Sequence, residues 1–505
     1  MEQASAIWID VEDLFHYVGH NARLSGIQRL TYELYTVLEQ QAAGGRPVGF
    51  VRIDARTDAF TVVAWEQVRG LCHALTVSHP VPEAQPAGSM VRVRRRSRGI
   101  AVALQRRLPA AAGVRFGHFC AQQTAALRAL MELRRASRTG RPAGRDDVAT
   151  AASGYAPTAT AGSGHASAEL PVGRPLRDVA RPGDWLLSLG AAWHRVDYGQ
   201  LLQRARTDLG VRTGLLFYDL IPLRRPEWCH QKLVQSFGRW FDGVMPHADA
   251  IFAISEATAQ DVGSYLEQRG KTPVRPIRTI PVGTGFPAST AALGGEAARI
   301  PARRLPAPGS YVLFVSTIEA RKNHALMFQV WRRMAQELPP HEVPTLVFAG
   351  RIGWLVADLM LQIANTNYVD GKLQIIEDPS DAVLIRLYQG CLFTVLPSLF
   401  EGWGLPVTES LAAGKPCVIS NLTALPEAGA GLARLIDPFD FNDAYRVILD
   451  TVRDRDGLAR WEQEVRSRFR PVSWERSARA LLDGLDAHEA AMRDHPVAVD
   501  REVAP

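Results

Sequence analysis

A glycine-rich loop flanked by two carboxylates is the part of this sequence best suited to chemistry. The loop, Pro-Ser-Leu-Phe-Glu-Gly-Trp-Gly-Leu-Pro-Val-Thr-Glu at 397–409, follows an apolar run typical of a buried strand and leads into a predicted helix. Its glycines allow a ligand close to the backbone, and free amides at the start of the helix can bind a phosphate. Its carboxylates can accept hydrogen bonds from sugar or ribose hydroxyls. We therefore predict a sugar-nucleotide site that contains Glu401, Gly402, Gly404, Leu405 and Glu409.

Two adjacent cations lie after another predicted strand. The segment Val-Ser-Thr-Ile-Glu-Ala-Arg-Lys-Asn at 315–323 begins where the apolar run 311–315 ends, and it contains Arg321 and Lys322. When a sugar leaves a nucleoside diphosphate, negative charge grows on the diphosphate, and fixed cations stabilise that charge. The alternative is a solvated pair of cations on a loop. The presence of Lys322 favours a diphosphate site, because lysine is rare in this chain: only five of the 58 basic residues are lysines.

The end of a predicted strand at 213–218 carries a third candidate. There the sequence Leu-Phe-Tyr-Asp-Leu-Ile-Pro-Leu, residues 216–223, places Tyr218 and Asp219 where the strand becomes a turn. Ligand sites in parallel sheets lie at the carboxyl ends of the strands, so both residues are site candidates. The alternative, that Asp219 caps the following turn, has equal weight on the sequence alone.

A fourth candidate is the turn Ser-Gly-Ile at 25–27, which precedes a helical pattern. Gly26 allows close approach to a ligand, and Arg29 supplies a nearby cation. A capping box formed by Ser25 and Gln28 accounts for the same residues structurally. The turn by itself does not decide between the two roles.

The elements that must position these residues alternate strands with helices. A first series contains strands predicted at 6–11, 48–53, 184–189, 213–218, 250–254 and 277–282. After a linker rich in Pro, Ala and Gly at 286–309, a second series contains strands predicted at 311–315, 345–349, 373–376, 392–396, 417–420 and 434–436. Helical patterns between them predict parallel sheets covered on both faces. We therefore expect an α/β fold with two doubly wound Rossmann-like domains facing a central cleft.

Together these motifs resemble those of the retaining GT-B glycosyltransferases of family 4, whose signature is a Glu, seven residues and a second Glu around a glycine-rich loop. The resemblance implies a GT-B fold and transfer of a sugar, with retention, from a nucleotide-diphosphate donor to a hydroxyl. It implies that Arg321 and Lys322 hold the diphosphate with amides of the 402–405 loop. It also implies that Glu409 binds the ribose and that Glu401 lies near the transferred sugar. No metal or other cofactor is expected.

The chain departs from the family pattern at three positions. Ser316 stands where Gly is usual, and Ala320 stands where Pro is common, but neither change removes a charge. Tyr218 stands where relatives often have His before the conserved Asp, here Asp219. A tyrosine phenol titrates near 10, so a proton-shuttle role is not carried over, and a hydrogen bond to a sugar hydroxyl is expected instead. Gly26 matches the family's N-terminal glycine loop, which faces the donor phosphate and the acceptor.

The resemblance also sets the expected domains and substrates. It implies an N-terminal acceptor domain at 1–290, a C-terminal nucleotide-sugar donor domain at 305–472, and a helix at 473–488 that crosses back to the N-terminal domain. Relatives with Tyr-Asp-Leu-Ile-Pro include mannosyl- and rhamnosyltransferases, so GDP-mannose is the favoured donor. A polysaccharide or lipid-linked oligosaccharide is the favoured acceptor. A nucleotide-sugar epimerase or a phosphorylase is a rival; the paired glutamates disfavour the first, and the lack of an evident pyridoxal-binding lysine disfavours the second.

The formal charge of +6 is concentrated in one segment. Residues 91–145 contain 14 arginines and one acid, a charge of +13, which leaves the rest of the chain at −7. They lie in an insertion at about 85–180 whose stretch from 138 to 168 is predicted to be disordered. Attraction of 91–145 to an anionic membrane surface is our hypothesis, and a non-enzymatic scaffold is the rival function. Aromatic residues for base stacking are nearly absent there, so no nucleic-acid partner is expected.

The remaining composition fits a cytoplasmic enzyme. With 47% hydrophobic and 22% charged residues, the chain can bury a core and is not a disordered or fibrous protein. Its five cysteines show no CxxC spacing and no metal-ligand spacing, as expected in a reducing compartment. No run of 18 apolar residues is present. We expect a cytoplasmic protein that acts at the inner face of the cytoplasmic membrane.

Overall fold

The computed structural model describes residues 5–18, 24–42, 45–76, 172–271, 276–285 and 305–494. The described elements belong to one unit, residues 1–76 with 167–505. The segment 91–145, the disorder predicted for 138–168 and most of the predicted linker lie outside the described residues.

The first sheet has seven strands in the order β3-β2-β1-β4-β5-β6-β7. Its strands are β1 (Ile7–Asp10), β2 (Val48–Asp54), β3 (Ala59–Val63), β4 (Trp185–Ser188), β5 (Arg212–Phe217), β6 (Ala250–Ala253) and β7 (Ile277–Thr279). All neighbours pair in parallel except β2 and β3, which are antiparallel. β1 and β4 are buried at every residue, as expected for central parallel strands whose two faces are both covered.

Helices cover both faces of this sheet. They are α1 (Glu12–Val18), α2 (Gly26–Ala42), α3 (Trp65–Thr76), α7 (Tyr198–Leu209), α8 (Ile221–Arg224), α9 (Gln231–Val244), α10 (Glu256–Gln268) and α21 (Trp474–Asp494). One hydrophobic cluster joins the sheet to α2, α3 and α21, and a second joins its other face to α7, α9 and α10. The two clusters take alternate residues of β1, since Ile7 and Ile9 belong to the first and Trp8 to the second.

This domain departs from the sequence prediction in three places. The segment after the first strand, for which no helix is predicted, forms α1, because Leu14 packs in the core and the Asp10 carboxylate accepts the amide of Glu12. β3 was not predicted, although Phe60 and Val62 alternate as they should in a strand with one buried face. β7 ends at Thr279 rather than at 282.

The second sheet has six strands, all parallel, in the order β10-β9-β8-β11-β12-β13. Its strands are β8 (Tyr311–Val315), β9 (Thr345–Ala349), β10 (Leu373–Ile376), β11 (Thr394–Leu396), β12 (Cys417–Ser420) and β13 (Arg434–Ile436). Its helices are α13 (His324–Glu337), α14 (Ala357–Asn365), α15 (Asn367–Asp370), α16 (Asp381–Gly390), α17 (Leu405–Ala412), α18 (Leu425–Ala428), α19 (Phe441–Arg453) and α20 (Arg455–Arg468). The α/β fold with two Rossmann-like sheets is therefore confirmed, with one antiparallel strand at the edge of the first.

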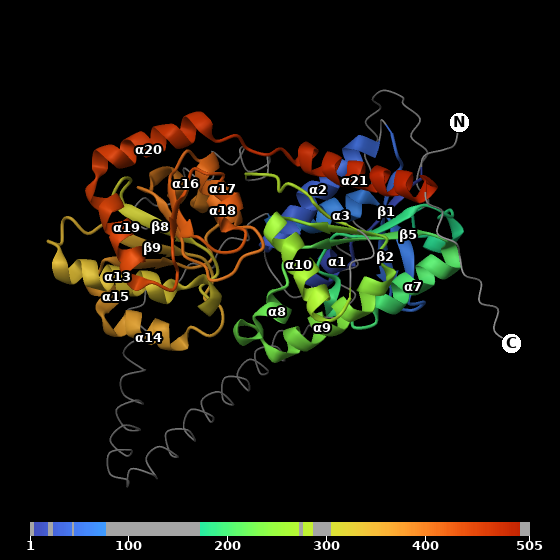
Figure 1. The fold of residues 1–505 in the computed structure, drawn as a ribbon, viewed down its shortest axis with the longest axis horizontal. Helices are drawn as coiled ribbons and strands as arrows, with labels where there is room; N and C mark the ends of the chain where they lie inside the picture. The colour runs from blue at the N-terminus through green and yellow to red at the C-terminus, as the bar shows by residue number, and fades with distance from the viewer. Residues whose placement is uncertain are drawn as a thin grey trace, which may run out of the picture. The chain divides into compact units, whose positions relative to one another are not determined.

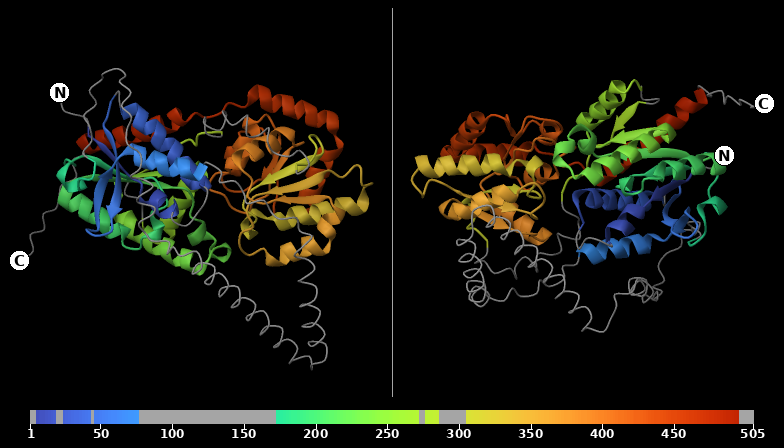
Figure 2. Two further views of the ribbon diagram at one scale, coloured as in Figure 1. Left: turned by 180° about the vertical axis from the view of Figure 1, so that it is seen from behind. Right: turned by 90° about the horizontal axis from the view of Figure 1, so that it is seen from below.

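The C-terminal helix α21 lies against the first sheet, not the second. It packs beside α2 and against β6 (Figures 1 and 2). The approach to β6 is close, because a Cβ on Gly484 would lie 2.5 Å from the Phe252 ring. The segment that follows the second domain therefore completes the core of the first.

Glu489 ties α21 to the first sheet. Its Oε1 atom accepts hydrogen bonds from Trp185 Nε1 at 2.7 Å and from the Ser5 hydroxyl at 2.7 Å. The same atom lies 2.6 Å from an Arg46 nitrogen and 3.1 Å from an Arg212 nitrogen. We expect Glu489→Gln to lower the free energy of unfolding by about 1.5–3 kcal/mol, the usual contribution of a hydrogen bond to a charged group. Chemical denaturation measures this loss.

The stability difference should depend on pH in a defined direction. Burial opposes the ionised form, but hydrogen bonds from Trp185 and Ser5 and the charge of Arg46 lower the pKa of Glu489. A carboxylate with a lowered folded-state pKa stabilises fully above its ordinary value and loses this contribution as pH falls through the lowered value. The wild type should therefore approach Glu489→Gln in stability as the pH falls below 4.5, the ordinary pKa of a glutamate. Glu464→Gln, an exposed carboxylate paired with Arg468, is the control; a pH-independent gap at Glu489 would contradict the assignment.

Candidate active site

Two loops of the second domain meet at the point where its strand order reverses. β8 and β11 are neighbours, but the chain proceeds from β8 toward one edge of the sheet and from β11 toward the other. Crevices at the carboxyl ends of such strands are the usual ligand sites of open α/β sheets. The loops that leave these two strands are 316–323 and 397–404, which carry the predicted basic motif and the predicted glycine-rich motif.

The structure joins these motifs through Glu401. Lys322 Nζ lies 2.5 Å from Glu401 Oε1, and Arg321 NH1 lies 2.9 Å from Glu401 Oε2. Arg321 also pairs with Glu319 at 2.8 Å and donates to the Phe400 carbonyl. These are nearly buried groups: the side chains of both cations are 14% exposed and that of Glu401 is 9% exposed. The cluster holds two cations and two carboxylates.

The electrostatics of the cluster favour its charged form. Burial alone would raise the pKa of Glu401, but the adjacent charges of Arg321 and Lys322 outweigh it and lower that pKa to about 2. Burial and the charge of Arg321 lower the pKa of Lys322 from its ordinary value. Glu401 is therefore an anion at neutral pH. It is paired with two cations, Arg321 and Lys322, that would also attract an incoming phosphate.

The second predicted carboxylate, Glu409, faces a different pair of groups. Its Oε1 lies 2.8 Å from the Arg29 guanidinium of α2, and its Oε2 accepts a hydrogen bond from the Tyr388 hydroxyl at 2.9 Å. Glu409 and Tyr388 are buried, whereas the Arg29 side chain is 19% exposed. Tyr388 and Glu319 contact the predicted site residues Glu409 and Arg321, and the sequence interpretation missed both. Glu319 could have been found from its place two residues before Arg321.

Tyr218 and Asp219 lie against the glycine-rich loop. A Cβ on Gly402 would lie 1.8 Å from the Tyr218 carbonyl oxygen and 3.1 Å from Asp219 Cβ. The Tyr218 hydroxyl is buried and donates to the Leu189 carbonyl at 2.5 Å, so it has a structural partner at the end of β4. Asp219 accepts the Ile221 amide at 2.9 Å, which is the capping role offered above as the alternative.

Asp219 also belongs to the electrostatic surroundings of the cluster. Burial raises its pKa, the Ile221 amide opposes this, and the charges of Arg321 and Glu401 act in opposite directions. Capping and a place in the site are therefore compatible for this residue. Its carboxylate adds to the negative charge that surrounds Arg321 and Lys322.

The remaining predicted residues surround the start of α17. Gly404 is its N-cap with φ of +118°, a conformation that side chains rarely adopt, and a Cβ there would lie 2.6 Å from Leu425. Leu405 is the first residue of the helix. A Cβ on Gly26 would lie 3.5 Å from Leu405 Cδ1, an ordinary contact, so Gly26 is next to α17 without being required by space.

Gly402, like Gly404, leaves no space for a side chain. We expect Gly402→Ala to displace the loop from Tyr218, because the new Cβ overlaps the carbonyl oxygen. Donor turnover should fall at least about tenfold, since small misplacements at a reacting centre are costly. Gly263→Ala in α10, where a Cβ meets nothing within 4 Å, is the control and should keep wild-type turnover. Equal turnover of both variants would show that the loop position is not critical.

Among the described residues, no three His, Cys, Asp or Glu side chains are arranged to hold a metal ion. No helix within the described ranges has the length and apolar character needed to cross a bilayer.

Comparison with known proteins identifies the class of the second domain. Residues 299–468 match the family described as Glycosyl transferases group 1. The second domain therefore resembles the group 1 glycosyltransferases over residues 299–468, and the two Rossmann-like sheets of the chain are those of a GT-B fold.

The curated relatives include mannosyltransferases. The chain is 27% identical over 285 residues to the serotype-specific mannosyltransferase WbdA of Escherichia coli, covering 55% of this chain and 34% of that protein. It is 31% identical over 144 residues to the O-antigen chain mannosyltransferase B of Escherichia coli, covering 28% of this chain and 37% of that protein. The chain thus spans about a third of the length of these relatives. Among solved structures, TarM aligns with a TM-score of 0.46 and 13% identity, over 62% of this chain and 57% of TarM.

Proposed function

We propose that this chain transfers a mannosyl residue from GDP-mannose to a hydroxyl of a polysaccharide or lipid-linked oligosaccharide, with retention of anomeric configuration. The observation that carries the proposal is the contact of Arg321 and Lys322 with Glu401 at the reversal point of a group 1 glycosyltransferase domain. The names of two relatives, both mannosyltransferases, support mannose as the sugar.

The proposed roles follow from the chemistry of each group. Arg321 and Lys322 would exchange Glu401 for the donor diphosphate and stabilise the charge that grows on it. Glu401, released from one or both cations, would hold a hydroxyl of the transferred sugar, and Glu409 would bind the ribose hydroxyls. Amides at Gly402, Gly404 and Leu405 would face the phosphates. Tyr218 and Asp219 would position the glycine-rich loop.

No covalent nucleophile is part of this proposal. The acceptor hydroxyl would attack the anomeric carbon from the face that the diphosphate leaves, and the departing phosphate oxygen would take the acceptor proton. The carbon–oxygen bond to the diphosphate breaks as the new glycosidic bond forms, which conserves atoms and charge. Positioning and electrostatic stabilisation would supply most of the rate enhancement.

The test is nucleotide release against a panel of donors. GDP-mannose, UDP-glucose, UDP-N-acetylglucosamine and dTDP-rhamnose would each be incubated with octyl hexosides as acceptors, and NMR of the product would give its anomeric configuration. Fastest release from GDP-mannose with an α-linked product supports the proposal. Release from another donor overturns the donor assignment, and absence of turnover with every pair overturns the activity.

We further propose that the enzyme works in the cytoplasm, at the membrane that carries its acceptor. The arginine-rich segment 91–145 has the charge for attraction to anionic lipid, at roughly 1 kcal/mol for each basic residue near the surface. Deletion of 91–145 should reduce binding to anionic liposomes at low salt. Unchanged binding would contradict the membrane role without affecting the proposed activity.

A further inference from the structure

The first sheet has its own reversal point, between β1 and β4. From β1 the chain proceeds to β2 and β3 on one side, and from β4 it proceeds to β5, β6 and β7 on the other. The rule that locates ligand sites at the carboxyl ends of such strands therefore points to α1, which follows β1, and to residues 189–197, which follow β4. None of the residues assigned above to the donor lies in these two segments.

The loop after β4 is fixed at its start by two buried groups. The Tyr218 hydroxyl donates to the Leu189 carbonyl at 2.5 Å, and the Ala191 amide donates to Asp13 Oδ2 at 3.1 Å. Gly190 lies between these anchors, and a Cβ there would be 2.3 Å from the Asp13 carboxylate. The absence of a side chain at Gly190 lets that carboxylate reach the loop.

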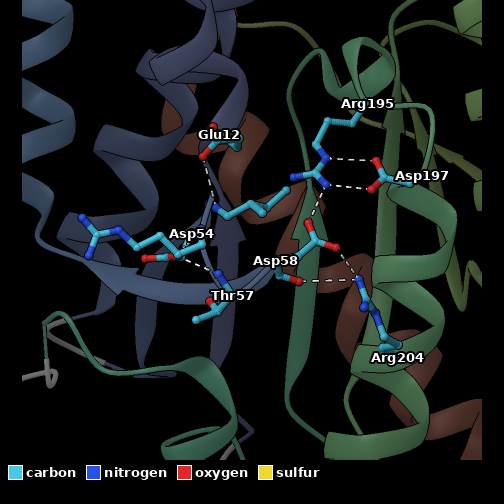
Figure 3. A network of polar contacts seen from close by, with 9 residues as sticks. Glu12, Asp54, Thr57, Asp58, Arg195, Asp197 and Arg204 are labelled. Carbon is cyan, nitrogen blue, oxygen red and sulfur yellow. Dashed lines mark hydrogen bonds and ion pairs between the residues drawn. The ribbon is translucent and has the colours of Figure 1, made fainter. Parts of the chain in front are cut away.

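The loop is fixed at its end by ion pairs (Figure 3). Arg195 donates to both carboxylate oxygens of Asp197 at 3.1 and 2.8 Å, and it lies 2.6 Å from Asp58 in the turn between β2 and β3. Arg204 of α7 holds the other oxygen of Asp58 at 2.8 Å. These contacts, on both sides of the short helix Ala192–His194, hold the position of His194.

Two histidine side chains, His16 and His194, are in contact beside this loop. The rings of His16 in α1 and His194 stack with centroids 4.2 Å apart and an angle of 14° between their planes. His16 is exposed and His194 is half-buried. His194 Nδ1 lies 3.0 Å from the Ala191 carbonyl oxygen. Because a carbonyl only accepts, Nδ1 carries a proton in this contact, and Nε2 of the neutral ring is an acceptor.

We propose that the His16–His194 pair is a subsite for the sugar acceptor, in which His194 Nε2 accepts a hydrogen bond from an acceptor hydroxyl. The proposal rests on the glycosyltransferase activity proposed above and adds the group that binds the second substrate. Its support is the conjunction of the reversal point, the anchored loop and a ring whose tautomer leaves an acceptor atom at Nε2. The alternative is that His194 has only a structural role, in which Nδ1 closes the turn by donating to the Ala191 carbonyl.

Asparagine and glutamine distinguish these two roles. The amide nitrogen of Asn occupies the place of Nδ1 and can keep the bond to the Ala191 carbonyl, whereas the amide of Gln reaches the place of Nε2. We expect His194→Asn to raise the acceptor KM about tenfold and His194→Gln to raise it less than about threefold. Both variants should hydrolyse GDP-mannose at the wild-type rate when no acceptor is present. His247→Asn, at the amino-terminal edge of the same sheet, is the matched control.

The experiment uses the full chain and the octyl hexoside that gives most product with the wild type. The opposite ranking, with Asn active and Gln impaired, would show a turn-closing role and overturn the proposal. Unchanged KM in both variants, or an equal loss of acceptor-free hydrolysis, would also overturn it. A wild type that neither hydrolyses the donor nor glycosylates any hexoside would instead overturn the proposed activity, so the two failures are distinguishable.

Discussion

Lys322→Ala is expected to lower kcat for sugar transfer by about 10²–10³, the usual loss when one fixed donor to a developing charge is removed. The ammonium of Lys322 is 2.5 Å from Glu401 and almost fully buried, so no water-exposed cation can easily replace it. Nucleotide release at saturating donor measures the loss. Lys372→Ala, whose ammonium donates to the Val343 carbonyl at 2.9 Å, is the control in the same domain.

A double variant separates two meanings of this loss. If Lys322 only neutralises Glu401, then Lys322→Ala combined with Glu401→Gln should be no slower than Glu401→Gln alone, because no uncompensated carboxylate remains. If Lys322 binds the diphosphate, the double variant should be slower than Glu401→Gln alone. Wild-type kcat in Lys322→Ala, with a normal melting temperature, would show that the basic loop is not the diphosphate site.

Strand bounds in the second sheet follow from the sequence because most of its strands are short apolar runs, and β8, β9, β11 and β12 are buried along nearly their whole length. β8, β9, β10, β12 and β13 have the predicted limits, and β11 starts two residues later than predicted. The first sheet is harder to predict, since β3 alternates rather than forming a continuous apolar run, and α1 is only seven residues long and begins with Glu12 and Asp13. Its strand order also depends on pairings across the large insertion, such as that of Ile7 with Trp185.

The candidate site was predictable as motifs but not as contacts. Arg321 and Glu401 are 80 positions apart, and they meet because β8 and β11 are neighbours, which composition and periodicity do not reveal. The motifs alone suggest separate functions, with the cations binding the diphosphate and the carboxylates binding the sugar and the ribose. The structure instead pairs Arg321 and Lys322 with Glu401. Tyr388 carried no local signal, because its role depends on the distance of α16 from Glu409.

Glu409→Gln is expected to weaken GDP binding by about 10- to 100-fold, because charge-assisted hydrogen bonds contribute about 1.5–3 kcal/mol each. Glu409 is buried, and the contacts from Arg29 and Tyr388 fix both of its oxygens, as the proposed contact with the ribose requires. Tyr388→Phe removes one of these contacts without removing charge, so its effect should be smaller. Calorimetric titration with GDP measures both.

A dideoxy nucleotide shows whether the ribose is the group that Glu409 binds. GDP without its 2′- and 3′-hydroxyls should bind the wild type as weakly as GDP binds Glu409→Gln, and the variant should not distinguish the two nucleotides. Independent losses from the variant and the analogue would place the carboxylate elsewhere on the donor. Glu462 lies on α20 and is paired with Lys415, and Glu462→Gln should bind GDP like the wild type. If Glu462→Gln also bound GDP weakly, loss of any ion pair in the domain would explain the result, and the ribose would no longer be assigned to Glu409.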